Sequence, residues 1–90
     1  MFAPLAIFSP RKGTARAGAQ IREGNSSLHE GDLAGALKAY NAAIEADPEN
    51  AFAWNNKGVV LENLGRSQEA LRCHNRAIKV RRAITPRDRV

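Results

Sequence analysis

The residues of this 90-residue chain that could carry out chemistry are one cysteine and two histidines. Cys73 and His74 are adjacent, so on a helix their side chains point about 100° apart and cannot form a nucleophile–base pair. His29 adds no spacing that is typical of a metal site, and no glycine-rich phosphate loop follows a strand pattern. The sequence therefore predicts a protein that is not an enzyme and has no catalytic, cofactor or metal site.

A basic patch near the carboxyl end is the second candidate for function. Arg72, Arg76 and Lys79 recur at intervals of four and three residues, which places them on one helix face, and Arg81 and Arg82 follow. Such a patch can bind an acidic protein, RNA or an anionic membrane surface, but it can equally be the solvated face of an outer helix. No aromatic residue is interleaved with it, which disfavours stacking on single-stranded nucleic acid.

The net charge of +5 is unevenly distributed. Residues 1–16 contain three basic and no acidic residues, residues 17–65 three basic and seven acidic, and residues 66–90 eight basic and two acidic. An acidic middle therefore lies between basic ends, and the charge of the whole chain says little about the partner of the middle section. We expect a basic and apolar segment over 1–16, a folded region over 17–84 and a basic tail over 85–90.

Length and composition restrict the class of protein. A chain of this size buries only about 60–65% of its unfolded surface, so self-association is plausible. No apolar run approaches the roughly 20 residues that span a bilayer, and one cysteine excludes an internal disulfide. Residues 2–8, "FAPLAIF", have their basic residues behind them, contrary to a secretory signal. We expect a cytoplasmic protein, although four basic and no acidic residues in 1–22 leave a transit peptide as an alternative.

The chain repeats itself once. When residues 17–50 are laid over residues 51–84, nine pairs are identical, against about two or three expected by chance. These pairs are Ala17/Ala51, Ala19/Ala53, Gly24/Gly58, Gly31/Gly65, Ala36/Ala70, Leu37/Leu71, Asn41/Asn75, Ala43/Ala77 and Ile44/Ile78. They are mainly small and apolar residues at helical spacing, which indicates a repeated helical unit.

Each unit is expected to contain two helices. We predict helices over residues 16–30, 33–46, 51–64 and 67–82. Asp32 and Asn50 are good N-cap residues, and Gly31 and Gly65 stand where helices end. The turns are two to four residues long, so successive helices pack antiparallel. No strand pattern competes with this assignment, and the predicted fold is all-α.

The period, about 34 residues, resembles that of the tetratricopeptide repeat, whose pattern is W-x₂-L-G-x₂-Y…A-x₃-F…P. The second unit supplies Trp54, Gly58, Gly65, Ala70 and Ala77, and the first supplies Gly24, Gly31, Ala36, Tyr40, Ala43 and Pro48. The resemblance covers two repeats, 17–50 and 51–84. It implies an α-solenoid fragment of antiparallel helix–turn–helix repeats that serves as a non-catalytic scaffold or adaptor for a protein or extended peptide. The alternative is a basic helical protein that associates with RNA or an anionic surface through its last helix.

The resemblance also implies a concave groove lined by the first helix of each unit. The predicted groove residues are Asn25, His29, Phe52, Asn55, Asn56, Val59, Glu62 and Asn63. Asparagine amides both donate and accept hydrogen bonds, which suits an extended peptide backbone, although exposed asparagines can also be merely solvated. Asn25 and Asn56 match two asparagines with which some members of the family hold the C-terminal carboxylate of heat-shock chaperones. Ile21 stands where the lysine of that clamp would be.

The spacing within "WNNKG" predicts the buried face of its helix. Trp54, Gly58 and Leu61 lie within about 60° of one another on a helical wheel. Gly58 should allow the partner helix to approach closely, near Ala70. His74 occupies a position that is usually aromatic in the family, and we expect a partly buried ring there.

The last helix offers Leu71, Ile78 and Val80 with no following unit to cover them all. Either residues 1–16 fold back as a cover on the first helix, or two chains associate weakly as a homo-oligomer.

Overall fold

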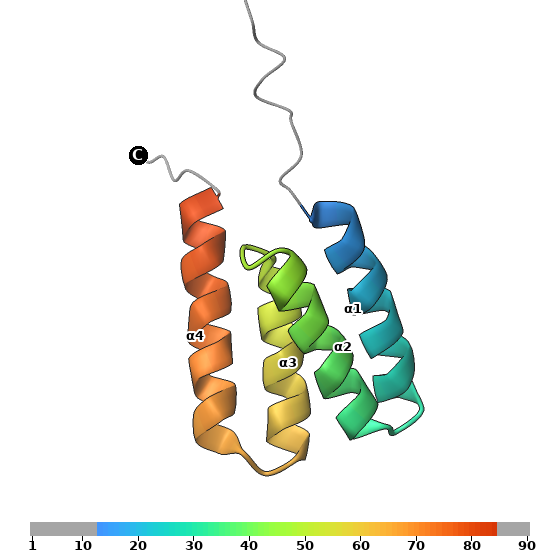
Figure 1. Ribbon diagram of the computed structural model, residues 1–90. Coiled ribbons are helices and arrows are strands. Elements are labelled where there is room, and N and C mark those ends of the chain that lie inside the picture. Colours follow the sequence, from blue (N-terminus) through green and yellow to red (C-terminus); the bar gives the residue numbers. More distant parts are fainter. Residues whose placement is uncertain (1–12, 85–90) are drawn as a thin grey trace, which may run out of the picture.

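The computed structural model describes residues 13–84, and all regular structure in that range is α-helical. The four helices are α1 (Thr14–His29), α2 (Leu33–Ala46), α3 (Ala51–Asn63) and α4 (Ser67–Ile84). They form two antiparallel hairpins that lie side by side, α1 with α2 and α3 with α4 (Figure 1). The predicted all-α class and helix–turn–helix repeats are confirmed.

The helix boundaries agree with the predicted ones in the middle of the chain and differ at its ends. Helix α1 begins two residues earlier than predicted, because Ala17 N donates to Gly13 O at 2.8 Å and so starts the helical hydrogen bonds at Gly13. Helix α4 continues two residues further than predicted, and Arg81 and Arg82 in its last turn suit the negative end of the helix dipole. Most of the predicted 1–16 segment and the whole 85–90 tail lie outside the described residues.

Local hydrogen bonds set the start of both inner helices. The carboxylate of Asp32 accepts from Gly35 N at 2.9 Å at the start of α2, and the amide oxygen of Asn50 accepts from Ala53 N at 3.1 Å at the start of α3. Each bond satisfies a backbone N–H that a helix start leaves unpaired. The N-cap roles predicted for both residues are therefore confirmed.

The two hairpin turns occupy equivalent places in the two units and have the same geometry. Gly31 and Gly65 adopt φ values of 81° and 79°, in the left-handed region that glycine occupies at little cost. Asp32 N donates to Ser27 O and Arg66 N donates to Leu61 O, both at 2.8 Å. This is the Schellman arrangement of a helix end, and its recurrence shows that the repeat extends to the turns.

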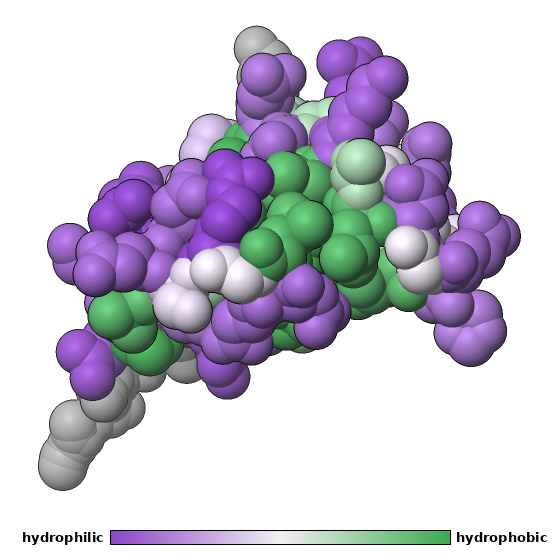
Figure 2. Space-filling model, turned by 90° about the horizontal axis from the view of Figure 1, so that it is seen from below, coloured by the Kyte–Doolittle hydropathy of each residue, from purple (hydrophilic) through white to green (hydrophobic). Residues whose placement is uncertain are grey.

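The two hairpins meet mainly through α2 and α3, while α1 contacts α3 over a smaller surface. Among the described helices, α4 contacts only α3. Seen from the end that holds the two hairpin turns, an apolar area reaches the surface between hydrophilic margins (Figure 2). The array therefore has an interior joint between its hairpins and leaves much of α4 uncovered.

The core consists of small residues around a few larger side chains. Ala17, Ala43 and Ala53 form one buried cluster. Ala36, Tyr40 and Val60 form a second, and a third is formed by Leu61, Ala70 and Cys73. Two of the clusters join residues of both units, so the packing of the hairpins against each other is part of the core.

Glycines allow close helix approach at two equivalent positions. A Cβ at Gly24 would lie 2.5 Å from the Tyr40 ring, and a Cβ at Gly58 would lie 2.6 Å from the His74 ring. The close approach predicted at Gly58 is confirmed, and the atoms nearest to such a Cβ belong to the His74 ring, one turn beyond Ala70 on α4.

One face of α4 is turned to α3 and the opposite face is open. Ala70, Cys73, Ala77 and Val80 are buried at intervals of three and four residues. Leu71 and Ile78 are 60% and 48% exposed, as the sequence predicted. Val80, which the sequence grouped with them, belongs to the buried face and is only 6% exposed. In the described part of the chain no helix is long and apolar enough to cross a membrane.

Candidate functional site

Two asparagines from different units meet between α1 and α3. The hydroxyl of Tyr40 donates to Asn25 Oδ1 at 2.5 Å, and Asn56 Nδ2 donates to the same oxygen at 3.2 Å. Burial raises the pKa of the Tyr40 hydroxyl, and a hydrogen bond with Asn56 opposes this with a smaller effect. The buried tyrosine therefore holds Asn25, and Asn25 in turn holds Asn56, so two residues of the predicted groove are joined. No described hydrogen bond involves Asn25 Nδ2 or Asn56 Oδ1, so the amide nitrogen of Asn25 can donate to a ligand and the amide oxygen of Asn56 can accept from one.

A second polar group joins α3 to α4. Nδ1 of His74 lies 2.9 Å from Asn55 Oδ1, and Nε2 lies 3.2 Å from Glu62 Oε2. Both neighbours are oxygen acceptors, so a neutral imidazole, which has one N–H, can donate to only one of them at a time. The ring is half-buried, as the sequence predicted. Asn55 and Glu62 are thus brought together by a residue that the predicted groove did not include.

A hollow of about 260 Å³ opens beside this group, between the amino-terminal end of α3 and the carboxyl-terminal end of α4. It is lined by Ala51, Phe52, Asn55, His74, Ala77, Ile78 and Arg81. Phe52 is 73% exposed. The hollow combines apolar walls with one cation and the polar pair of Asn55 and His74, and it can accept an amphipathic segment.

The remaining predicted groove residues form no described hydrogen bond with the two polar groups above. Val59 is half-buried on α3, whereas His29 and Asn63 are exposed at the carboxyl-terminal ends of α1 and α3. No described hydrogen bond joins these three to the asparagine pairs. Tyr40 and His74 were missed by the groove prediction, although they occupy the same place in the two units, where the repeat carries an aromatic residue. That equivalence is the signal by which they could have been found.

A different hollow, of about 410 Å³, is lined by basic residues around Trp54. Its lining residues are Trp54, Lys57, Leu61, Glu69, Arg72, Cys73 and Arg76. Lys57 Nζ and Arg76 Cζ lie 5.9 and 5.7 Å from the centre of the indole ring, within the range of cation–π attraction. Trp54 itself is anchored by its Nε1, which donates to Pro48 O at 2.8 Å.

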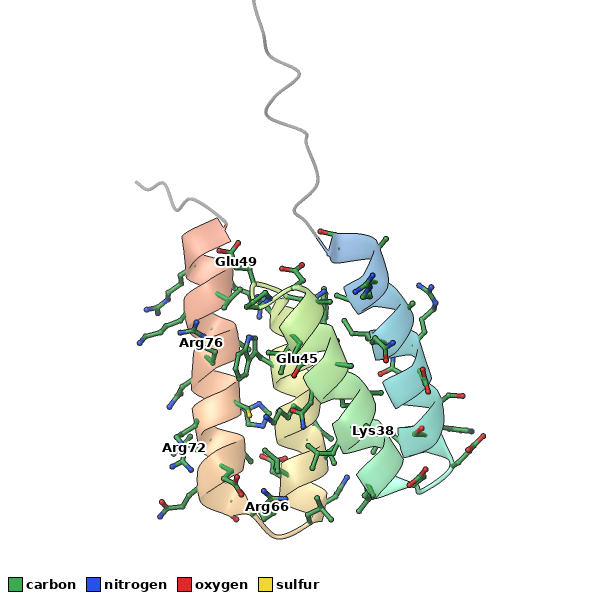
Figure 3. The ribbon with its side chains drawn as sticks, in the orientation of Figure 1. Lys38, Glu45, Glu49, Arg66, Arg72 and Arg76 are labelled. Carbon is green, nitrogen blue, oxygen red and sulfur yellow. The ribbon has the colours of Figure 1, made fainter. Side chains whose placement is uncertain are left out.

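The predicted basic patch is divided by the structure. Arg72 and Arg76 lie at the Trp54 hollow, and Arg81 lies at the other hollow. Lys79 and Arg82 are exposed and line neither hollow. Figure 3 shows the labelled residues Arg72 and Arg76 on α4, and Lys38 and Glu45 on α2. Residues 17–50 contain two basic and six acidic residues and residues 51–84 contain seven basic and two acidic ones, so the charges of the two units differ in sign.

The cysteine and the histidine next to it face different surroundings. Cys73 is buried against Leu61 and Ala70, and this burial raises the pKa of its thiol. No described hydrogen bond joins Cys73 to His74. Residues 13–84 contain no group of three or more histidine, cysteine or acidic side chains that could hold a metal ion.

Comparison with known proteins relates the chain to one repeat family. Residues 17–50 and residues 39–72 each match a family model described as tetratricopeptide repeat. The chain is 40% identical over 57 residues to an uncharacterized protein of Methanocaldococcus jannaschii, and this alignment covers 63% of this chain and 66% of that protein. It is 32% identical over 68 residues to DnaJ homolog subfamily C member 3 of Gallus gallus, with 76% of this chain and 14% of that protein covered.

It is also similar to Stress-induced-phosphoprotein 1 of Caenorhabditis elegans, with 39% identity over 49 residues. This alignment covers 54% of the chain and 15% of that protein. The chain thus spans about two thirds of the Methanocaldococcus protein and about a seventh of the other two.

Proposed function

The chain belongs to the tetratricopeptide-repeat family, a family of protein-interaction modules, and we propose that it binds an extended segment of a partner protein along the surface of α1 and α3. The observation that carries this proposal is the meeting of Asn25 and Asn56, one from each unit, over the buried Tyr40 hydroxyl. Because Tyr40 holds Asn25 and Asn25 holds Asn56 before a ligand arrives, little side-chain entropy is lost on binding. An extended backbone offers alternating donors and acceptors that match these amides.

The ligand is proposed to be a chain segment rather than a C-terminal carboxylate. Ile21, at the position of the clamp lysine, packs against two of the buried clusters of the core. It therefore supplies no charge to the groove, and a carboxylate held by Asn25 and Asn56 alone would lack the charge-assisted bond that makes such clamps strong. The two asparagines can still bind uncharged peptide groups.

The test uses a displayed library of random peptides of about 12 residues, which reach roughly 40 Å when fully extended. Peptides selected on the parent chain should bind the variant Asn25→Ala/Asn56→Ala about tenfold or more weakly, a loss of about 1.4 kcal/mol that fits two hydrogen bonds, and circular dichroism would check that the variant stays folded. The matched control is Asn41→Ala/Asn75→Ala, which removes two exposed asparagines of α2 and α4 that lie outside the groove. Equal loss in both variants, or no loss in either, would place binding on another surface.

A second function is supported by one observation, the contact between Trp54 and the basic residues of α4. The sequence placed no aromatic residue among those cations, but the fold brings the indole of α3 to Arg76 and Lys57, beside Arg72. A ring between cations is the arrangement with which proteins bind single-stranded nucleic acid. Association with RNA or another anionic partner is therefore the alternative proposal.

The fluorescence of Trp54, the only tryptophan, provides the assay. Titration with oligouridylate of about 20 nucleotides should quench it, with an affinity that falls steeply as salt rises. The variant Arg72→Ala/Arg76→Ala should reduce the salt dependence, whereas Arg22→Ala, an exposed cation of α1, should leave it unchanged. Quenching that is absent or independent of salt would exclude this alternative.

A further inference from the structure

The second unit leaves open a face that the first unit uses for packing. Helix α2 packs against both α1 and α3, whereas α4 contacts α3 alone among the described helices. Leu37 and Ile44 of α2 are half-buried against core clusters, and their equivalents in the second unit, Leu71 and Ile78, are 60% and 48% exposed. We name the open α4 face by Leu71, His74, Ile78 and Arg81 of α4 together with Phe52 and Asn55 of α3.

The helix that covers the first unit shows what geometry fits such a face. Helix α3 inserts Ala53 into the cluster of Ala17 and Ala43. Seven residues later it inserts Val60 against Tyr40. Seven residues correspond to about two helical turns, so both side chains lie on one face of α3. Ala43 and Tyr40 of α2 correspond to Ala77 and His74 of α4. A helix that packs antiparallel on the open α4 face in the same way would therefore place a small residue against Ala77 and, two turns later, an apolar residue against His74.

The open α4 face is more polar than the face of the first unit against which α3 packs. Ile21 and Tyr40 of the first unit correspond to Asn55 and His74, which are hydrogen-bonded to each other in the second. The apolar part of the face lies around this pair, in Phe52, Leu71 and Ile78. Because Asn55 and His74 are hydrogen-bonded to each other, the apolar side of an amphipathic helix can lie over them and contact Phe52, Leu71 and Ile78.

The positive charge of α4 indicates the charge of the helix that would bind to it. Helix α4 contains five basic residues and one acidic residue, a net charge of +4, while α2 contains one of each. Arg81 lines the hollow of the open α4 face, and Arg82 is exposed beside it in the last turn of α4. The amino-terminal end of an antiparallel helix lies next to these arginines. Acidic residues in its first turn would pair with them and would also be favoured by the dipole of that helix.

We propose that the open α4 face binds an amphipathic helix of a partner protein, with an acidic first turn, a small residue, and an apolar residue seven positions after it. This surface goes beyond the groove proposed above, because α4 supplies most of it. A second copy of this chain fits less well. Its helix equivalent to α3 is α1, which has no acidic residue in its first turn and carries Ser26 where α3 has Val60.

The probe is a pair of synthetic peptides of about 18 residues, since isolated helices shorter than about 12–15 residues are marginal in water. Both contain an alanine and, seven positions later, a leucine on a face that is otherwise apolar. One has three glutamates in its first turn and the other has glutamines there. Fluorescence anisotropy with the full chain should show binding of the acidic peptide, and about tenfold weaker binding of the glutamine peptide, since each exposed ion pair changes affinity only a few-fold.

Three variants locate the binding. Ile78→Glu puts a charge on an exposed position of the open α4 face and should abolish binding without unfolding the chain, which circular dichroism would check. Arg81→Glu should weaken the acidic peptide about threefold to tenfold and leave the glutamine peptide nearly unchanged. Lys79→Glu is the matched control, because it makes the same charge change two residues away on an exposed position that does not line the hollow, and it should have little effect.

Several outcomes would overturn the proposal. Equal affinity for the two peptides would show that the partner helix needs no acidic residues in its first turn, and that part of the proposal would be wrong. Equal weakening by Arg81→Glu and Lys79→Glu would show that the charge of the whole helix attracts the peptide without a docking face. If sedimentation shows the parent to be a dimer that Ile78→Glu converts to a monomer, a second copy occupies the face and the partner-helix proposal is wrong.

Discussion

Replacing Gly24 by alanine should destabilise the fold, although alanine is the better helix former. The added Cβ would lie 2.5 Å from Cε1 and 2.8 Å from Cδ1 and Cζ of Tyr40, whereas carbon atoms pack best at about 3.5–4.0 Å. Tyr40 is fully buried and donates its hydroxyl to Asn25. The ring cannot move aside without breaking that hydrogen bond or disturbing its contacts with Ala36 and Val60.

Two opposing contributions determine the size of the effect. Alanine in place of glycine within a helix stabilises it by about 0.5–1 kcal/mol. An extra methyl group in a well-packed interior costs about 1–3 kcal/mol. The net destabilisation is therefore about 1 kcal/mol, which lowers the melting temperature of a domain of this size by about 4–8 °C.

Two other glycines provide matched controls for the measurement. A Cβ at Gly18 would have Arg22 Nη1 as its nearest neighbour, at 3.7 Å, which is an ordinary contact, so Gly18→Ala should stabilise the chain by about 0.5–1 kcal/mol. A Cβ at Gly58 would lie 2.6 Å from the His74 ring. That ring is half-buried at the open side of the array and can move more easily than Tyr40. The Gly58→Ala variant should fall between the other two.

Urea unfolding followed by circular dichroism would rank the three variants. The expected order of stability is Gly18→Ala, then Gly58→Ala, then Gly24→Ala. If Gly24→Ala is stabilised as much as Gly18→Ala, the Tyr40 ring does not hold its place against α1, and our account of the joint between the helices is wrong.

The remaining predictions concern packing, capping and titration. Ala70→Leu should lose about 1–3 kcal/mol because the residue is buried against other core residues, and an unchanged thermal melt would contradict that packing. Asn50→Ala should cost about 0.5–2 kcal/mol in urea unfolding by removing the cap on Ala53 N, whereas Asn50→Asp should keep most of it. The raised pKa of the buried Cys73 thiol predicts slow reaction with a disulfide reagent near neutral pH, which should accelerate greatly in denaturant; equal rates would refute its burial. Tyr40, the only tyrosine, should ionise above its usual pKa of 10.0 in an absorbance titration, and the stability due to its neutral form should be complete below that pH and lost as the pH rises through the higher folded pKa.

The sequence by itself determined the local structure of this protein. The repeat period, the caps at Asp32 and Asn50, and the left-handed glycines Gly31 and Gly65 were all readable along the chain, and the caps and turns act within a few residues. Helices and turns of this kind are held by hydrogen bonds between near neighbours. For that reason the inner helices were predicted to within a residue, and the equivalent turns of the two units were recognised from the glycine spacing.

The sequence also indicated which helix faces are buried but not which side chains meet across them. Gly58 was expected to lie near Ala70, but the atoms nearest to a Cβ there belong to the His74 ring, which the sequence did not indicate. Val80 was grouped with the open residues Leu71 and Ile78 but is buried. Both differences arise because the neighbour of a residue across a helix interface depends on the angle and offset of the two helices, which a helical wheel does not contain.

Only the tertiary structure produced the candidate sites. It joined Asn25 to Asn56, in the other unit, by a hydrogen bond. It joined Asn55 to His74, and it brought Trp54 to Arg76. Each of these contacts links residues on different helices, and each forms only when the helices are packed, because no local hydrogen bond or turn holds the two side chains together. The sequence could therefore name several residues of these sites, while the packing of the two hairpins decided which of them act together.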